Sequence, residues 1–581
     1  MTEHKAASSY AAPGSSRDFL DTRPWQANYD ANVARDLQLP ETSLSHMFEG
    51  SVARYGNKTA LSFMGADTTY QDLGHEVGQV AEGLRRLGVE AGDRVAIVLP
   101  NCPQHIVAFY AVMRLGAVVV EHNPLYTAPE LRHQFEDHGA KVAIVWDKAA
   151  AAVQSLPTDI GLEHIISVDI TTAMPRFMRM ALKLPVKKLK QQRAALTMPA
   201  VGTTPWKDLR DHPRISSDHP YPTAHDLAVL QYTSGTTGVP KGAMLTHRNL
   251  ESNAVMGREW LNSGSQEVVY GALPLFHAFG LTLGMTFAMS LGATLVLFPT
   301  PRPDLIIKAM KKHPATVLPA VPPIYQKVME TADAQGVSLQ GVTVGVSGAM
   351  ALPVHLVDEW EQRTGGILIE GYGLTECSPL VSCNPLNNHR RAGSIGIPFP
   401  STQIRTVDPE TLEDVPKGQE GELWVRGPQI FQGYWKRPEA TAEALSDGWL
   451  RTGDIVVVDD DGFITVVDRL KEIIITGGFN VAPSEVEAAL RSSDAVQDAA
   501  VVGLRSDDGT EVVVAAVISS PSHDFDEQVL RQHCYTKVTR YKVPRRIVQV
   551  DDLPRTMLGK TQRRLVREDL EKRGIDVSSR G

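Results

Sequence analysis

Short apolar runs rich in β-branched residues alternate with amphipathic segments through most of the chain. The runs are RVAIV at 94–98, KVAIVW at 141–146, ATLVLF at 293–298, VTVGVS at 342–347 and GILIE at 366–370. Buried strands that alternate with helical patterns are typical of α/β layers with largely parallel sheets. The pattern therefore predicts an α/β fold.

The pattern changes twice towards the C-terminal end. Residues 396–468 carry short strand-like runs separated by turn signals, which favours a β-rich subdomain. Residues 469–581 mix helical and strand patterns in a segment of domain size. We expect a large N-terminal domain of layered α/β sheets at 41–468, which includes the β-rich subdomain, followed by a small α+β domain at 469–581. Residues 1–40 are polar and interrupted by proline, and we expect a loosely ordered arm there.

The segment 273–301 contains no Asp, Glu, Lys or Arg, and its apolar part LTLGMTFAMSLGATLVLF at 281–298 is almost long enough to span a membrane. Pro274 opens it, glycines interrupt it, and its β-branched end is typical of a buried strand. We therefore reject a membrane span and predict a helix and then a strand around an apolar cavity, although plain core packing explains most of these residues equally well.

Composition and charge exclude several classes of protein. The chain has 581 residues, of which 43% are hydrophobic and 22% charged, so a largely disordered or fibrous protein does not fit. Its formal net charge of −9 gives no basic footprint for nucleic acid. Four cysteines, none in a CxxC pair, form no disulfide framework or zinc motif and indicate a reducing compartment. The first residues lack the apolar core of a secretory signal, and we expect a cytoplasmic location.

The segment 174–193 is basic and amphipathic, unlike the chain as a whole, which has a negative net charge. Seven Lys or Arg residues alternate there with Phe, Met and Leu, and no acidic residue occurs between Asp169 and Asp208. Such a segment can lie on an anionic membrane surface, here the inner face. An ordinary solvated helix pair broken by Pro185 is an equally good interpretation.

The segment YTSGTTGVPKG, which starts at Tyr232, has the composition of a phosphate-binding loop. Glycines let backbone N–H groups close around phosphate oxygens, hydroxyls donate further hydrogen bonds, and Lys241 adds a positive charge. Pro240 stands where a P-loop NTPase needs glycine, so the Walker A motif is absent. The candidate phosphate-binding positions besides Lys241 are Thr233, Ser234, Gly235, Thr236, Thr237 and Gly238.

This loop and its companions resemble the signature of the adenylate-forming superfamily, which includes acyl-CoA synthetases, luciferases and adenylation domains. The companions are VSGAM at 346–350, GYGLTE at 371–376, GELWVRG at 421–427, TGD at 452–454, DRLKEIIITGGFNVAPSEVE at 468–487 and PRTMLGK at 554–560. The resemblance covers nearly the whole chain. GYGLTECSPLVSCNP, GFNVAPSEVE and RYKVPRRI are most similar to bacterial long-chain fatty acyl-CoA synthetases.

The resemblance implies ATP and Mg²⁺ as cofactors and assigns roles to individual residues. Glu376 matches the Mg²⁺ ligand, and Thr375 matches a donor to the α-phosphate. Lys560 matches the lysine that bridges the carboxylate and the α-phosphate during adenylation. The other implied nucleotide positions are Gly348, Ala349, Gly371, Tyr372, Gly373, Asp454 and Arg469.

The resemblance also implies that the small α+β domain at 469–581 is a mobile lid domain, which rotates between two half-reactions. Lys471 matches the hinge of this rotation. Gly477 and Gly478 match a loop that lines the channel for the pantetheine arm of coenzyme A, the co-substrate of the second step. A simple β-turn is the alternative interpretation of this glycine pair.

The acyl group is expected to bind near PLFHAFG at 274–280, where His277, Phe279 and Gly280 match the family's substrate pocket. The absence of an acidic residue argues against an amino-acid substrate, because its buried ammonium group would lack a partner. His277 fits a packed core histidine as well.

The resemblance thus implies a long-chain fatty acid:CoA ligase. The alternatives are a ligase for medium-chain, aryl or branched acids, an acyl-AMP ligase that loads a carrier protein, and a scaffold without activity. A homodimer is a further expectation.

Overall fold

The computed structural model describes residues 16–39, 41–233, 240–476, 479–506, 511–556, 558–575 and 577. The chain forms two compact units. The larger consists of Tyr29–Thr402 and Arg426–Leu450, and the smaller of Met1–Asn28, Gln403–Val425 and Arg451–Gly581.

A seven-stranded sheet forms one layer of the larger unit. Its strands, in spatial order, are β7 (Thr204–Pro205), β6 (His164–Val168), β5 (Val142–Trp146), β3 (Arg94–Val98), β4 (Val118–Glu121), β8 (Leu227–Thr233) and β9 (Lys241–Thr246). All neighbours are parallel except β8 and β9, which form an antiparallel pair. The continuous apolar runs of β3, β4 and β5 follow from their position in the interior of the sheet, where both faces are buried.

A nine-stranded sheet forms a second layer. In spatial order it contains β16 (Ile397–Pro398), β15 (Leu380–Cys383), β14 (Ile367–Gly373), β13 (Val344–Ser347), β12 (Val317–Ala320), β10 (Val268–Gly271), β11 (Thr294–Leu297), β1 (Thr59–Phe63) and β2 (Ala66–Thr69). The run from β14 to β1 is parallel, and antiparallel strands close both ends. The expected largely parallel sheets are therefore confirmed.

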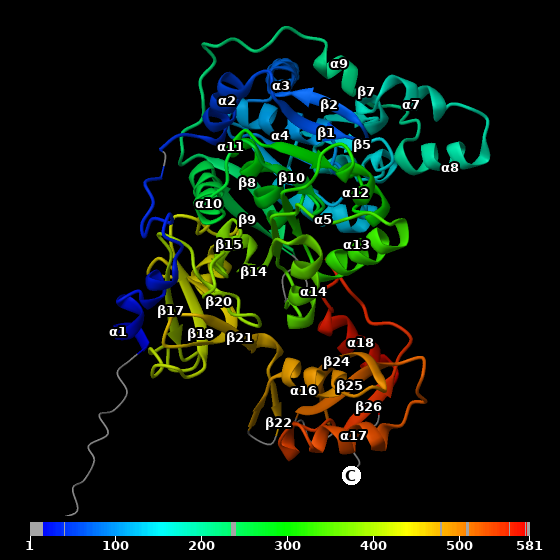
Figure 1. Cartoon of the computed structure of the whole chain (residues 1–581). Coiled ribbons are helices and arrows are strands. Elements are labelled where there is room, and N and C mark those ends of the chain that lie inside the picture. The colour runs from blue at the N-terminus through cyan, green and yellow to red at the C-terminus, as the bar shows by residue number, and fades with distance from the viewer. Residues whose placement is uncertain are drawn as a thin grey trace, which may run out of the picture. The chain divides into compact units, whose positions relative to one another are not determined.

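Helices pack around these two sheets (Figure 1). They are α2 (Leu44–Tyr55), α3 (Tyr70–Arg86), α4 (Pro103–Arg114), α5 (Ala128–His138), α6 (Ala150–Gln154), α7 (Arg176–Ala181), α8 (Lys187–Leu196), α9 (Trp206–Arg210), α10 (His247–Trp260), α11 (Phe287–Leu291), α12 (Pro303–Met310), α13 (Pro322–Gln335), α14 (Val354–Thr364) and α15 (Pro438–Ala444). Several begin at side-chain caps. In α5, the side chain of Thr127 and that of Glu130 form a reciprocal capping box.

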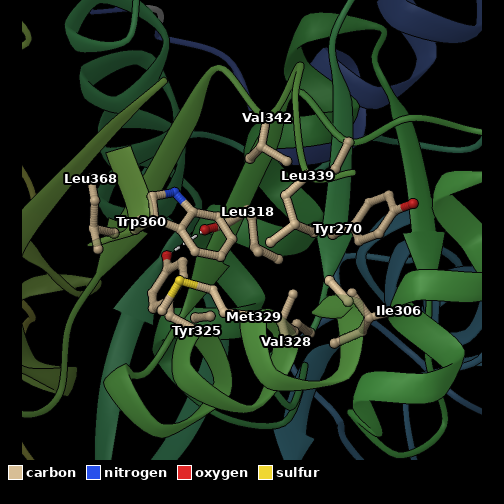
Figure 2. Close-up of a cluster of buried hydrophobic side chains, with 14 of the residues drawn as sticks. Tyr270, Ile306, Leu318, Tyr325, Val328, Met329, Leu339, Val342, Trp360 and Leu368 are labelled. Atoms are coloured by element: carbon tan, nitrogen blue, oxygen red, sulfur yellow. Dashed lines mark hydrogen bonds between the residues drawn. The ribbon is translucent and has the colours of Figure 1, made fainter. Parts of the chain in front are cut away.

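The core between β10, β12–β14 and helices α12–α14 is aromatic at its centre (Figure 2). The rings of Tyr325 and Trp360 meet edge to face, with centroids 4.8 Å apart. The Tyr325 hydroxyl donates a hydrogen bond to the Leu318 carbonyl at 2.6 Å, so the phenol is buried without losing its hydrogen bond. This core supports strands β13 and β14, whose ends carry candidate site residues.

The uncharged segment 273–301 forms the predicted helix and strand. A π-helical turn, η4 (Gly280–Thr286), continues into α11, and β11 follows. All residues of η4 are buried. Among the described residues, no helix combines the length and the apolar character that a membrane crossing requires.

The smaller unit contains three sheets and four helices among its described residues. It carries β17 (Gln403–Val407), most of β18 (Gly421–Arg426) and β20 (Trp449–Val458), and β21 (Ile464–Arg469), and β19 (Leu445–Ser446) completes the five-stranded sheet. The other sheets are β22 (Ile474–Thr476) with β23 (Phe479–Val481), and β24 (Val496–Arg505), β25 (Glu511–Ser519) and β26 (Arg546–Gln549). The helices are α1 (Ser16–Asp21), α16 (Pro483–Arg491), α17 (Glu527–Tyr535) and α18 (Arg563–Lys572).

The sheet β24–β25–β26 buries both of its faces. Ala499 and Val501 pack into a core with α16 and α17, whereas Ala500 and Val502 pack into a second core with α18. Successive side chains of a strand point to opposite faces, which explains why β24 is apolar without interruption. The predicted α/β class with a β-rich region and a small α+β C-terminal region is confirmed. The domain boundaries at 40, 396 and 468 stay predictions.

Candidate active site

The candidate phosphate loop connects β8 to β9. Thr233, the last residue of β8, pairs with Lys241, the first residue of β9. The predicted strand before the loop is therefore present. The predictions for Ser234, Gly235, Thr236, Thr237 and Gly238 concern positions outside the described residues.

Tyr434 lies between Lys241 and Glu376, the two charged residues assigned to ATP and its metal. The Nζ atom of Lys241 is 5.1 Å from the centroid of the Tyr434 ring, and the Tyr434 hydroxyl donates to Glu376 Oε1 at 2.7 Å. The sequence motifs did not single out Tyr434. The signal that could have found it is the GYW sequence shortly after GELWVRG.

Glu376 lies in a short 3₁₀ turn, η5 (Thr375–Cys377), which follows the end of β14. The backbone carbonyl of Glu376 accepts a hydrogen bond from the Phe431 amide at 2.9 Å, so the main chain of this residue is fixed as well as its side chain. Gly371, Tyr372 and Gly373 form the last part of β14. Thr375 and Glu376 are partly exposed and accessible to a ligand.

The end of β13 meets the candidate acyl-binding segment. A β-carbon on Gly348 would lie 3.1 Å from the Phe279 ring and 3.2 Å from the Gly371 carbonyl oxygen, so only glycine fits without a shift. Ala349 follows with a φ of 65° and is exposed. The structure therefore brings together Gly348, Phe279 and Gly371, which the resemblance had assigned to nucleotide and acyl recognition.

Two buried amides hold the acyl-binding segment in place. Asn101 donates to the Leu273 carbonyl at 2.7 Å and accepts from the Leu275 amide at 2.9 Å. Gln231, from β8, donates to the Phe276 carbonyl at 2.7 Å. Neither residue was predicted, because each lies more than forty positions from its partners.

His277 is neutral at physiological pH. Burial lowers its pKa to about 4. Its Nδ1 atom accepts a hydrogen bond from the Phe279 amide at 3.3 Å, so the remaining proton is on Nε2. His277 can therefore donate a hydrogen bond from Nε2 without carrying a charge. Gly280 begins the π-helical turn beyond it.

In the smaller unit, the strand pair β20–β21 positions Asp454 opposite Arg469. The Arg469 Nε atom lies 3.2 Å from Asp454 Oδ1. Lys560 belongs to the same electrostatic cluster. Burial and the charge of Arg469 lower the pKa of Lys560 to about 8, although Glu472 and Asp454 oppose the shift. Lys471 is exposed in the turn η6 (Leu470–Glu472), and Gly477 and Gly478 lie outside the described residues.

Arg563, the first residue of α18, is a residue of the smaller unit that sequence reasoning missed. Its guanidinium binds both carboxylate oxygens of Glu487 at 2.8 Å, Asp468 Oδ1 at 3.3 Å and the carboxylate of Glu472. Asp468 also accepts hydrogen bonds from the amide and hydroxyl of Ser484. This network connects the predicted hinge segment to α16 and α18.

Two family models match the chain. The family model described as AMP-binding enzyme matches residues 48–435, and the model described as AMP-binding enzyme C-terminal domain matches 485–560. The chain is 36% identical over 561 residues to a long-chain-fatty-acid–CoA ligase of Bacillus subtilis, covering 95% of this chain and 99% of that protein. It is 38% identical over 557 residues to a long-chain-fatty-acid–CoA ligase of Escherichia coli O6:H1, covering 94% and 98%.

A solved structure of similar fold is that of ATP-bound MatB from Rhodopseudomonas palustris. It superposes with a TM-score of 0.77 at 28% identity and covers 91% of this chain and 99% of that one. The family model spans well over half of the chain, and the sequence relatives align over nearly their full length. The chain therefore belongs to the AMP-binding enzyme family.

Proposed function

We propose that this protein is an ATP-dependent long-chain fatty acid:CoA ligase. In the first step, a fatty acid carboxylate attacks the α-phosphate of ATP, and acyl-AMP forms as pyrophosphate leaves. In the second step, the thiol of coenzyme A attacks the acyl carbon, and acyl-CoA forms as AMP leaves. The observation that carries the proposal is the similarity to long-chain-fatty-acid–CoA ligases along nearly the whole chain.

The first step brings a carboxylate against a polyanion, so the protein must supply cations and oriented donors. Lys241 is proposed to bind the phosphates from the start of β9, and Thr375 to donate to the α-phosphate. Asp454 offers two acceptor oxygens for the ribose hydroxyls, next to Arg469. Lys560 is proposed to bind the fatty acid carboxylate and the α-phosphate, and Lys471 to serve as the hinge of the lid.

Glu376 is proposed to hold Mg²⁺. Its Oε1 atom accepts the Tyr434 hydroxyl, so Oε2 and the remaining lone pairs are available for a metal. Magnesium in nucleotide sites takes one or two carboxylates together with phosphate oxygens, and a single glutamate fits this pattern. When bound, Mg²⁺ neutralises charge on the departing pyrophosphate.

The acyl pocket is proposed to select an uncharged chain. His277 is neutral, the segment 273–301 contains no charged side chain, and η4 is buried throughout. The neutral imidazole can donate a hydrogen bond to a carboxyl oxygen of the substrate at the pocket entrance. Because it carries no charge, it does not attract a further anionic group into the pocket. An apolar wall then favours a hydrocarbon tail over an amino acid.

The test is pyrophosphate release with ATP, Mg²⁺ and a series of fatty acids, each with and without coenzyme A. We expect a maximum at long chains and thioester formation that depends on coenzyme A. A maximum with aryl or medium-chain acids would mean that these acids, and not long-chain fatty acids, are the substrates. Pyrophosphate release without any thioester would support the acyl-AMP ligase instead.

A variant at Lys560 separates the two half-reactions. Lys560→Ala should abolish acyl-AMP formation but leave thioester formation from synthetic acyl-AMP within a few-fold of the wild type. Equal loss of both steps would contradict the role proposed for Lys560.

We also propose that the basic segment 174–193 contacts an anionic membrane surface. Helices α7 and α8 lie at the edge of the larger unit (Figure 1), and Phe177 and Met180 are 68% and 65% exposed. Exposed apolar side chains among cations match a negatively charged bilayer surface. The cations are Arg176, Arg179, Lys183, Lys187, Lys188, Lys190 and Arg193.

Co-sedimentation with vesicles of phosphatidylglycerol tests this contact. Replacing Lys187, Lys188 and Lys190 by glutamate should release the protein. The matched control replaces three exposed lysines elsewhere, Lys308, Lys311 and Lys327, and should still bind. Equal binding of both variants would exclude this segment as the anchor. A homodimer and a cytoplasmic location stay predictions.

A further inference from the structure

Tyr434 contacts both charged residues that the proposed chemistry assigns to the ATP phosphates and the metal. Its hydroxyl donates to Glu376 Oε1 at 2.7 Å, and its ring faces the Lys241 ammonium, with 5.1 Å from Nζ to the ring centroid. Phe431 packs edge to face against the same ring, with centroids 4.9 Å apart. One phenol thus contacts a cation through its face and an anion through its hydroxyl.

The backbone around Tyr434 is held firmly. The Gln432 amide donates to the Met244 carbonyl, the Met244 amide to the Gly433 carbonyl, and the Trp435 amide to the Gly242 carbonyl, at 2.8–3.0 Å. The Tyr434 amide donates to Thr441 Oγ1 at 2.9 Å. The segment therefore lies along β9 like an additional strand, which sets the position of the ring relative to Lys241.

The position of the ring matters because Lys241 and Glu376 have opposite charges. Lys241 and Glu376 both lie in the described part of the chain, and they form no ion pair with each other there. A direct ion pair would use up the positive charge meant for phosphate and the carboxylate meant for a metal. An aromatic ring attracts the ammonium by a cation–π interaction and keeps it away from the carboxylate.

We propose that Tyr434 is a positioning residue that orients Glu376 and separates it from Lys241, so that both charges remain available to metal-bound ATP. The hydroxyl occupies Oε1 and directs Oε2 towards the ligand. This inference rests on the proposed adenylation chemistry, and it assigns Tyr434 to the first half-reaction alone.

The test compares Tyr434→Phe with Tyr535→Phe, a matched change at a partly exposed tyrosine at the end of α17. Electron paramagnetic resonance measures Mn²⁺ binding in the presence of a non-hydrolysable ATP analogue. Tyr434→Phe should weaken Mn²⁺ binding about tenfold, the loss expected for one hydrogen bond to a charged group. Tyr535→Phe should bind Mn²⁺ like the wild type.

Activity assays supply the second readout. In Tyr434→Phe, the Mg²⁺ concentration for half-maximal pyrophosphate exchange should rise about tenfold. Thioester formation from synthetic acyl-AMP should stay within twofold of the wild type, because this step uses neither the metal nor the triphosphate. Tyr434→His retains a ring and an N–H donor and should recover part of the Mn²⁺ affinity.

Three results would overturn the inference: unchanged Mn²⁺ affinity in Tyr434→Phe, an equal loss in both half-reactions, or a Tyr434→Phe protein that does not fold. The last two would mean that the hydroxyl supports the fold instead of the metal ligand. Failure of the proposed function would look different, because the wild-type protein would then release no pyrophosphate with any acid, while Mn²⁺ binding would still report on Tyr434.

Discussion

Lys560 should give the first half-reaction an unusual dependence on pH. Burial, followed by the charge of Arg469, lowers the pKa of Lys560 to about 8, well below the usual value for lysine. The proposed role of Lys560 requires the protonated ammonium, because it binds a carboxylate and a phosphate. Activity should therefore be present below this pKa and lost as the pH rises through it.

The size of the effect follows from the pKa. With a pKa of about 8, about ten of every eleven Lys560 side chains are protonated at pH 7, and about one of every eleven at pH 9. The value of kcat/KM for ATP, which reports the free enzyme, should fall about tenfold over this range. A lysine with the ordinary pKa of about 10.4 would remain almost fully charged at pH 9.

The assay is pyrophosphate exchange from pH 6.5 to 9.5 for the wild type and two variants. Lys560→Arg keeps its charge throughout, so its lower activity should not decline between pH 7 and 9. Glu472→Gln removes a charge that raises the pKa of Lys560, and it should move the decline to lower pH. Thioester formation from acyl-AMP should instead speed up, because a larger fraction of the coenzyme A thiol is ionised as the pH rises. A wild-type activity that does not decline up to pH 9.5, or the same decline in Lys560→Arg, would refute the reasoning.

Three further predictions concern stability. Trp360→Ala should destabilise the larger unit by about 3–5 kcal/mol in urea unfolding. Trp360→Phe should cost far less, because the indole N–H has no hydrogen-bond partner among the described residues, and equal costs would be evidence against this account. Arg563→Ala should cost about 3–5 kcal/mol, because three carboxylates lose a shared cation. Hydrogen exchange in α16 and α18 should be faster in this variant than in the wild type, and unchanged exchange would contradict the prediction. Gly396→Ala should lower the melting temperature strongly, because the new β-carbon would lie 2.0 Å from the Cys383 carbonyl carbon, whereas Gly393→Ala, also at positive φ but in open space, should cost only about 1–2 kcal/mol. Similar melting temperatures for both glycine variants would disprove the steric argument.

Several features of the fold could be predicted because they depend on local pattern. The runs that became β3, β5, β11 and β13 are continuous and apolar, since strands inside a parallel sheet are buried on both faces. Glycine and proline within 273–301 correctly argued for a buried helix and strand over a membrane span. The order of strands in each sheet could not be predicted, because it depends on contacts between segments far apart in the chain.

The same division applies to the candidate site. Lys241, Glu376, Asp454 and Lys560 were found because each lies in a contiguous motif, and a motif preserves the spacing that its chemistry needs. Tyr434 was missed because its partner Glu376 is 58 positions away, and the two meet only in the folded chain, where the Phe431 amide also donates to the Glu376 carbonyl.

Distant contacts likewise govern the charges of the site. The partners of Arg563 at Asp468 and Glu487 are 95 and 76 positions away. The lowered pKa values of His277 and Lys560 come from burial, which no local pattern specifies. Motifs thus named the chemical groups of this protein because chemistry depends on residue type and short spacing. Folding determined which groups are neutral, paired or kept apart, because hydrogen bonds and desolvation depend on neighbours in space.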